Sequence, residues 1–250
     1  MTKLVYIDIG THFGQEFQSM FGSRWYFLWK LTRRIIGYYF LKKGERISIK
    51  NLIEMLQQRR KIKKHEDNFL TYFIEANPNI INYCNVYQKA NGVFNLALTG
   101  EENVNITNLF LANFDTEKTI SQGSSIFSYK NNVSKENFVS TIGIPSQLFF
   151  DLLKKYLDNI VNEYVVILRL NCEGVEDDVI YAAHKYFGNK LVLIMGSIED
   201  VKECKGNNAF LALEKYLDNN SLKFVYFSSS VSSWIKAHYS INLVCNNHLN

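Results

Sequence analysis

The chain has little of what marks secreted, membrane-spanning or disordered proteins. Only two of its 250 residues are proline, and its thirteen glycines form no low-complexity linker. Four cysteines, Cys84, Cys172, Cys204 and Cys245, lie far apart without a Cys-x-x-Cys pair, which argues against a disulfide framework or a zinc site. No apolar run reaches about eighteen residues, and the run before Asp8 is too short for a signal peptide. We therefore expect a soluble cytoplasmic protein with reduced thiols.

The chain does have enough apolar sequence for one large core. Hydrophobic residues make up 47% of it and aromatic residues 14%, so we expect a single domain over residues 1–250. The predicted strands are Leu4–Ile9, Thr71–Glu75, Val93–Leu98, Tyr164–Leu170, Leu191–Met195, Lys223–Phe227 and Ile241–Cys245. The predicted helices between them include Phe149–Val161, Val175–Phe187 and Ala209–Asn219. This alternation predicts an α/β fold with a mostly parallel sheet covered on both faces, and residues 99–145 are expected as short strands and loops over one edge.

Charge is distributed unevenly. Residues 21–66 contain thirteen Lys and Arg against three acids, a net charge of +10, so the rest of a chain of total charge +4 carries −6. The basic residues are Arg24, Lys30, Arg33, Arg34, Lys42, Lys43, Arg46, Lys50, Arg59, Arg60, Lys61, Lys63 and Lys64. Aromatic residues lie among them at helical spacing. A helical lid with solvated cations, an interfacial helix on an anionic membrane, and a grip for a phosphate-bearing acceptor or a nucleic acid are all open interpretations.

The first strand ends in an acid and a glycine loop, Asp8-x-Gly10-x-x-x-Gly14. Gly10 permits a tight turn and close approach of a ligand to the backbone, while Gly14 lets the next helix pack near the strand. Ligands of parallel sheets bind beyond the carboxyl ends of the strands, and an acid at the end of the second strand typically accepts hydrogen bonds from ribose. Glu75 is in that position. The pattern lacks the middle glycine of a dinucleotide loop, so these residues alone leave nucleotide binding and an ordinary strand–turn–helix both open.

Five segments in order resemble the FkbM-type S-adenosylmethionine-dependent methyltransferases: YIDIGTHFGQEF, FIEANP, NLALTG, QGSSIF and VVILRLNCEGVEDDVI. The resemblance covers Leu4–Glu16 and about Thr71–Ala183. It implies a seven-stranded Rossmann-like class I methyltransferase sheet whose last strand is antiparallel, with residues 21–66 as a basic helical insertion between the first and second strands. It also implies S-adenosyl-L-methionine as cofactor and O-methylation of a hydroxyl on a sugar, a glycan precursor or a similar small metabolite.

The resemblance also implies roles for individual residues. Cofactor binding would fall to Asp8, Gly10, Gly14, Glu75, Asn77, Asn95, Ala97, Ser124 and Ser125. The end of the fourth strand, with Asn171, Glu173 and Glu176, would face the methyl group to be transferred. Of these, Glu176 is interpreted as complementing the dipole of the helix that follows.

The chain departs from the family pattern at Arg169 and Asn171, where a lysine and an aspartate are usual. Because an amide is a poor ligand for a hard cation, we expect no metal. An alcohol acceptor needs a general base, and the candidates are Glu173 and His12, a residue type that titrates near neutral pH. A nucleic-acid methyltransferase and a non-catalytic binding module of the same fold remain as alternative functions.

Overall fold

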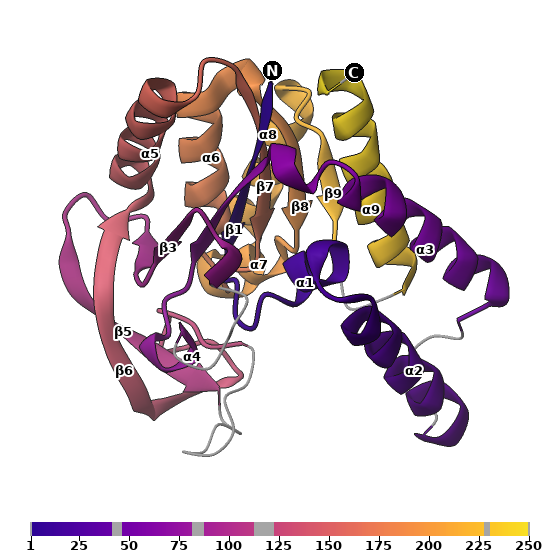
Figure 1. Cartoon of the computed structure of the whole chain (residues 1–250). Helices are drawn as coiled ribbons and strands as arrows, with labels where there is room; N and C mark the ends of the chain where they lie inside the picture. The colour runs from indigo at the N-terminus through magenta and orange to yellow at the C-terminus, as the bar shows by residue number, and fades with distance from the viewer. Residues whose placement is uncertain (1, 42–46, 82–87, 113–122, 228–230, 250) are drawn as a thin grey trace.

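The structure, a computed structural model, describes residues 2–41, 47–81, 88–112, 123–227 and 231–249. Its central sheet has six strands in the order β3-β2-β1-β7-β8-β9, and every neighbouring pair among them is parallel (Figure 1). The strands are β1 (Lys3–Ile9), β2 (Phe69–Ile74), β3 (Gly92–Phe94), β7 (Tyr164–Leu170), β8 (Leu191–Gly196) and β9 (Phe224–Tyr226). The strand order reverses between β1 and β7, which makes this point the topological switch of a Rossmann-like sheet. The predicted α/β fold with a mostly parallel sheet is confirmed.

Helices cover both faces of the sheet, as predicted. Leu4 and Tyr6 of β1 pack into one hydrophobic cluster, and Val5 and Ile7 pack into another, because successive side chains of a strand point to opposite faces. The first cluster contains residues of α1 (Gln15–Phe21), α3 (Ile49–Lys63) and α9 (Val231–His248). The second contains residues of α5 (Ser146–Ile160), α6 (Glu176–Phe187) and α8 (Asn207–Asn219). The sheet is therefore the middle layer of three (Figure 1).

A smaller sheet lies beside the central one. It has the order β4-β6-β5, with β4 (Ala97–Thr99) parallel to β6 (Val133–Pro145) and β5 (Asn105–Ala112) antiparallel to it. The prediction of one strand over Val93–Leu98 was wrong, because that run divides between β3 and β4 in two different sheets. The division occurs at Asn95, whose side chain donates to the Glu75 carbonyl at 2.7 Å.

The predicted strand Ile241–Cys245 was also wrong. This apolar run lies inside α9, where the buried residues Trp234, Ala237, Ile241 and Val244 recur every three or four positions. That period is helical, and the run is one stretch of a helix face packed on the sheet. No antiparallel strand joins the central sheet within the ranges that the structure describes.

Between β1 and β2, the described residues 10–41 and 47–68 form the α-helices α1, α2 (Arg24–Leu41) and α3. One of the basic residues here belongs to the core: Arg59 of α3 is 7% exposed and donates to the carbonyls of Ser19, at 3.0 Å, and Gly22. The described residues also form the short elements η1 (Glu66–Asn68), α4 (Pro78–Ile81), η3 (Gly188–Lys190) and α7 (Glu199–Lys205).

Some predictions concern residues outside the described ranges. These residues are Lys42, Lys43, Arg46, Cys84 and part of the segment 99–145. The other three cysteines are free thiols, with Cys204 and Cys245 buried and Cys172 partly exposed. No helix in the described part of the chain is long and apolar enough to cross a bilayer.

Candidate functional site

A cavity lies at the topological switch, beyond the carboxyl ends of β1, β2 and β7. The cavity opens to solvent, and its volume, including the open part, is about 630 Å³. Many of its lining residues belong to the segments singled out in the sequence: Gly10, His12, Glu75, Asn77, Ala97, Asn171 and Glu173 near the strand ends, and Ser124 of the segment QGSSIF. Its apolar wall includes Ile80, Leu96, Leu109 and Val175. An apolar pocket with a few converging polar groups is the usual form of a small-molecule site, and it lies where ligands of such sheets bind.

The glycine loop after β1 is shaped by close backbone contact. Gly10 has φ +68°, and a Cβ added there would lie 2.0 Å from the carbonyl oxygen of Asn171. The missing side chain therefore faces β7, which corrects the interpretation that Gly10 leaves space for the ligand. Gly14 precedes α1 with φ 60°, and its N–H donates to the Thr11 carbonyl at 2.8 Å. Gly14 does not line the cavity and instead forms the turn into the helix.

Glu75 holds the glycine loop against the end of β2. One carboxylate oxygen accepts the backbone N–H of His12 at 2.7 Å, and the other accepts that of Asn77 at 2.8 Å. Burial raises the pKa of Glu75, and these two backbone donors offset part of that increase. A carboxylate has about four lone-pair sites, so two such bonds leave acceptor capacity for hydroxyl groups in the cavity.

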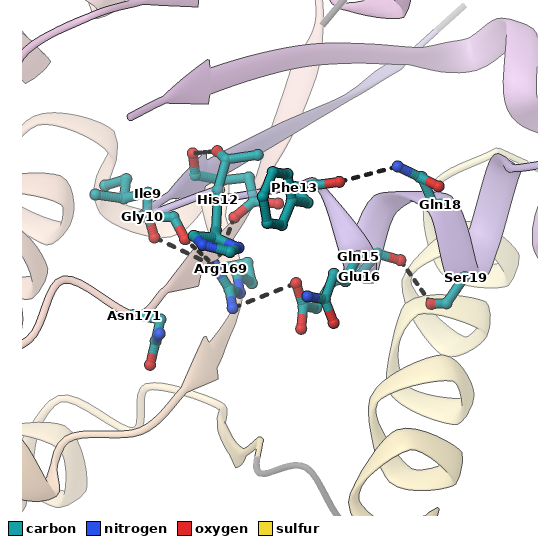
Figure 2. A network of polar contacts seen from close by, with 12 residues as sticks. Ile9, Gly10, His12, Phe13, Gln15, Glu16, Gln18, Ser19, Arg169 and Asn171 are labelled. Atoms are coloured by element: carbon teal, nitrogen blue, oxygen red, sulfur yellow. Dashed lines mark hydrogen bonds and ion pairs between the residues drawn. The ribbon is translucent and has the colours of Figure 1, made fainter. Parts of the chain in front are cut away.

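Beneath the loop, Arg169 of β7 connects three acceptors (Figure 2). Its guanidinium donates to Asp8 Oδ1 at 3.0 Å and to the Gly10 carbonyl at 2.8 Å, and it pairs with Glu16 of α1 at 3.3 Å. Asp8 is fully buried and does not line the cavity, so its carboxylate supports the loop from below. This differs from the direct cofactor contact that the resemblance implies. Burial raises the pKa of Asp8 to about 7, because the cost of desolvation exceeds the attraction of Arg169.

Glu173 is held by a buried lysine that the sequence did not single out. Lys130 is 5% exposed and pairs with both Glu173 and Asp200, the latter at 2.8 Å. The side-chain amide of Asn171 donates to the other oxygen of Glu173 at 3.3 Å. Burial raises the pKa of Glu173 and the charge of Lys130 opposes this change. The net pKa of Glu173 lies above that of a free carboxylate, but both of its oxygens already accept hydrogen bonds, from Lys130 and Asn171, and this occupation weakens the case for Glu173 as the base.

Two further residues shape the turn after β7 without lining the cavity. Glu176 is fully buried and accepts the backbone N–H groups of Cys172 at 3.0 Å and Gly174 at 2.9 Å. Its role is thus to hold the turn, in agreement with its position in the first turn of α6. Ser125 donates to the Glu173 carbonyl at 2.7 Å, so it supports the turn while its neighbour Ser124 lines the cavity.

Three comparisons with known proteins found no match: no family model matches the chain, and no curated protein or solved structure matches it significantly.

Proposed function

We propose that this protein is an S-adenosylmethionine-dependent O-methyltransferase acting on a hydroxyl of a sugar, glycan precursor or similar small metabolite. One observation carries the proposal: the glycine loop, Glu75 and the end of β7 converge on a single cavity at the topological switch. In the family that the chain resembles, these segments surround the cofactor. Residues 21–66 would then be an insertion into a methyltransferase sheet.

The residues present fit this cofactor. Glu75 lines the cavity with acceptor capacity for ribose hydroxyls, and Ala97 with the apolar wall would cover the adenine. His12 and Asn171 would lie nearer the methyl group. The bound cofactor supplies a methyl group on a good leaving group, so the protein mainly has to align the acceptor oxygen, an effect that can supply about 7–11 kcal/mol.

Isothermal titration calorimetry with S-adenosylmethionine tests the proposal. We expect micromolar affinity that Glu75→Gln weakens by roughly 10- to 100-fold, because a charge-assisted hydrogen bond is lost. Since Glu75 also holds the loop, Ser124→Phe provides a second variant that fills the cavity and keeps the carboxylate. Release of S-adenosylhomocysteine in an acceptor screen would then establish turnover. Absence of binding at millimolar cofactor in the folded parent protein would rule the proposal out.

A non-catalytic cofactor-binding module is the second candidate. The observation that favours it is the engagement of both Glu173 oxygens by Lys130 and Asn171, which leaves this carboxylate less free to take a proton from an acceptor hydroxyl. Tight cofactor binding without methyl transfer to any hydroxyl acceptor would support this alternative.

A further inference from the structure

Helix α2 has apolar side chains on two opposite faces, and only one of these faces packs against the described part of the domain. Phe27 and Leu31 are 1% and 3% exposed and form a cluster with Met55 of α3 and Trp234 of α9. A separation of four residues places Phe27 and Leu31 on the same side of the helix. This inner face accounts for the attachment of α2 to the domain.

The outer face exposes large apolar side chains along the length of the helix. Trp25 is 81% exposed, Trp29 56%, Ile36 47% and Phe40 79%. Their spacings of four, seven and four residues align them in one stripe about 22 Å long. Single exposed apolar residues are common on protein surfaces, but four large ones on one side of a helix indicate an interaction site. We call these four residues the α2 stripe, and Figure 1 shows α2 extending away from the central sheet.

The charges around the stripe indicate what covers it. Arg24 and Arg33 of α2 are exposed, and the Arg33 guanidinium lies 5.6 Å from the centroid of the Trp29 ring. Residues 21–66 carry a net charge of +10. A symmetric dimer through the stripe would bring the same basic surface of two copies together, which is unfavourable. An anionic lipid surface, in contrast, attracts the cations and accepts the aromatic rings at its interface.

We propose that the α2 stripe docks this protein on an anionic membrane, with α2 lying parallel to the surface and its inner face still packed on the domain. Tryptophan and phenylalanine on one side with arginine alongside are typical of such interfacial helices. This proposal does not depend on the methyltransferase assignment, since it uses none of the residues that line the cavity.

Vesicle co-sedimentation tests the proposal with phosphatidylcholine alone and with phosphatidylcholine mixed with phosphatidylserine. We expect binding to the anionic vesicles to be at least about tenfold stronger, to weaken with salt, and to fall at least about tenfold in the double variant Trp25→Ser, Phe40→Ser. Tryptophan emission should shift to the blue on binding, because Trp25 and Trp29 are exposed while Trp234 is buried.

The matched control is the double variant Leu152→Ser, Tyr156→Ser on α5, whose side chains are 56% and 49% exposed. It should bind vesicles as the parent does. Absence of vesicle binding by the parent protein, or an equal loss in the α5 control, would overturn the proposal. So would a dimer in sedimentation velocity without lipid that the α2 double variant dissociates, since a second copy would then cover the stripe.

Discussion

Arg169 and Asp8 form a buried ion pair, with 3.0 Å between the guanidinium and the carboxylate, directly beneath the loop that borders the cavity. Because Arg169 also reaches Glu16 and the Gly10 carbonyl, it joins β7, β1 and α1 at one point. The integrity of the candidate site therefore depends on a residue that does not line it.

Replacing Arg169 with methionine should destabilise the protein by about 3–5 kcal/mol, because Asp8 and Glu16 would lose the buried cation that compensates them. Urea unfolding followed by circular dichroism measures this loss. Lys155→Met is the control, since Lys155 pairs with Asp151 at the surface, and it should leave the unfolding midpoint nearly unchanged. Similar midpoints for the two variants would contradict a supporting role for Arg169.

Because the pKa of Asp8 is raised in the folded protein, ionisation of Asp8 lowers the free energy of unfolding as the pH rises. Its pKa is about 7 in the folded protein against 3.8 for the ordinary group, so between these values the folded state holds the proton more tightly. The contribution of Asp8 to the free energy of unfolding is fully present below the unfolded-state pKa, and it is lost as the pH rises through the folded-state pKa. The asparagine of Asp8→Asn cannot ionise. The free energy of unfolding of this variant, minus that of the parent, should therefore rise by roughly 2–3 kcal/mol between about pH 5 and about pH 7.5.

Urea unfolding of both proteins at the two pH values gives this difference directly. Other titrating groups cancel in the comparison, including Glu176, whose pKa burial raises to about 7, and His238, whose pKa burial lowers to about 4. A difference that does not change with pH would mean that Asp8 stays ionised throughout, with Arg169 compensating it fully.

Gly10→Ala should destabilise the fold before it affects a ligand. The added Cβ would meet the Asn171 carbonyl oxygen at 2.0 Å, and the positive φ adds strain, so we expect a loss of at least about 2 kcal/mol. Gly188→Ala is the matched control, because Gly188 also has a positive φ, +50°, but has nothing within 4 Å of the added atom. Thermal unfolding should show the larger loss for Gly10→Ala; equal losses would mean that backbone strain alone matters.

The sequence predicted the parts of the fold that depend on local pattern. Tyr164–Leu170 was predicted and found with the same bounds, because a strand buried on both faces reads as a nearly continuous apolar run, broken here by Arg169 alone. The run Ile241–Cys245 has the same appearance, yet it is helical, and only its longer context over residues 234–244 shows the helical period.

The part of the candidate site that lies at the ends of parallel strands could be predicted from the sequence. Parallel strands bring their carboxyl ends to one edge, so the convergence of Gly10, Glu75 and Asn171 follows from the topology. The buried pairs Arg169–Asp8 and Lys130–Glu173 join residues 161 and 43 positions apart. Such pairings depend on tertiary packing, and no local signal in the sequence marks Lys130 as a buried partner.

If the proposed methyl transfer is confirmed, it should not need a divalent metal. Where the family that the chain resembles has an aspartate, this chain has Asn171, whose amide donates to Glu173. An amide is a weak ligand for hard cations, so turnover should be unchanged in excess EDTA. Loss of turnover that magnesium restores would contradict this prediction. Asn171→Asp tests the same point in reverse, since it restores a hard anionic ligand at the end of β7 and should allow magnesium to change the rate.

The last prediction concerns the general base of the proposed reaction. Glu173 and His12 both line the cavity, but the two carboxylate oxygens of Glu173 are engaged by Lys130 and Asn171. We therefore expect His12→Ala to lower kcat at least about 100-fold.

Glu173→Gln should lower kcat less than about tenfold, because Lys130 keeps its pair with Asp200 and the turn after β7 keeps its backbone hydrogen bonds to Glu176. Cofactor affinity measured by calorimetry should be similar in both variants, which separates a lost base from a lost binding site. A 100-fold loss in Glu173→Gln with normal cofactor affinity would instead assign the proton transfer to Glu173. Full activity in both variants would mean that water or the acceptor itself takes the proton.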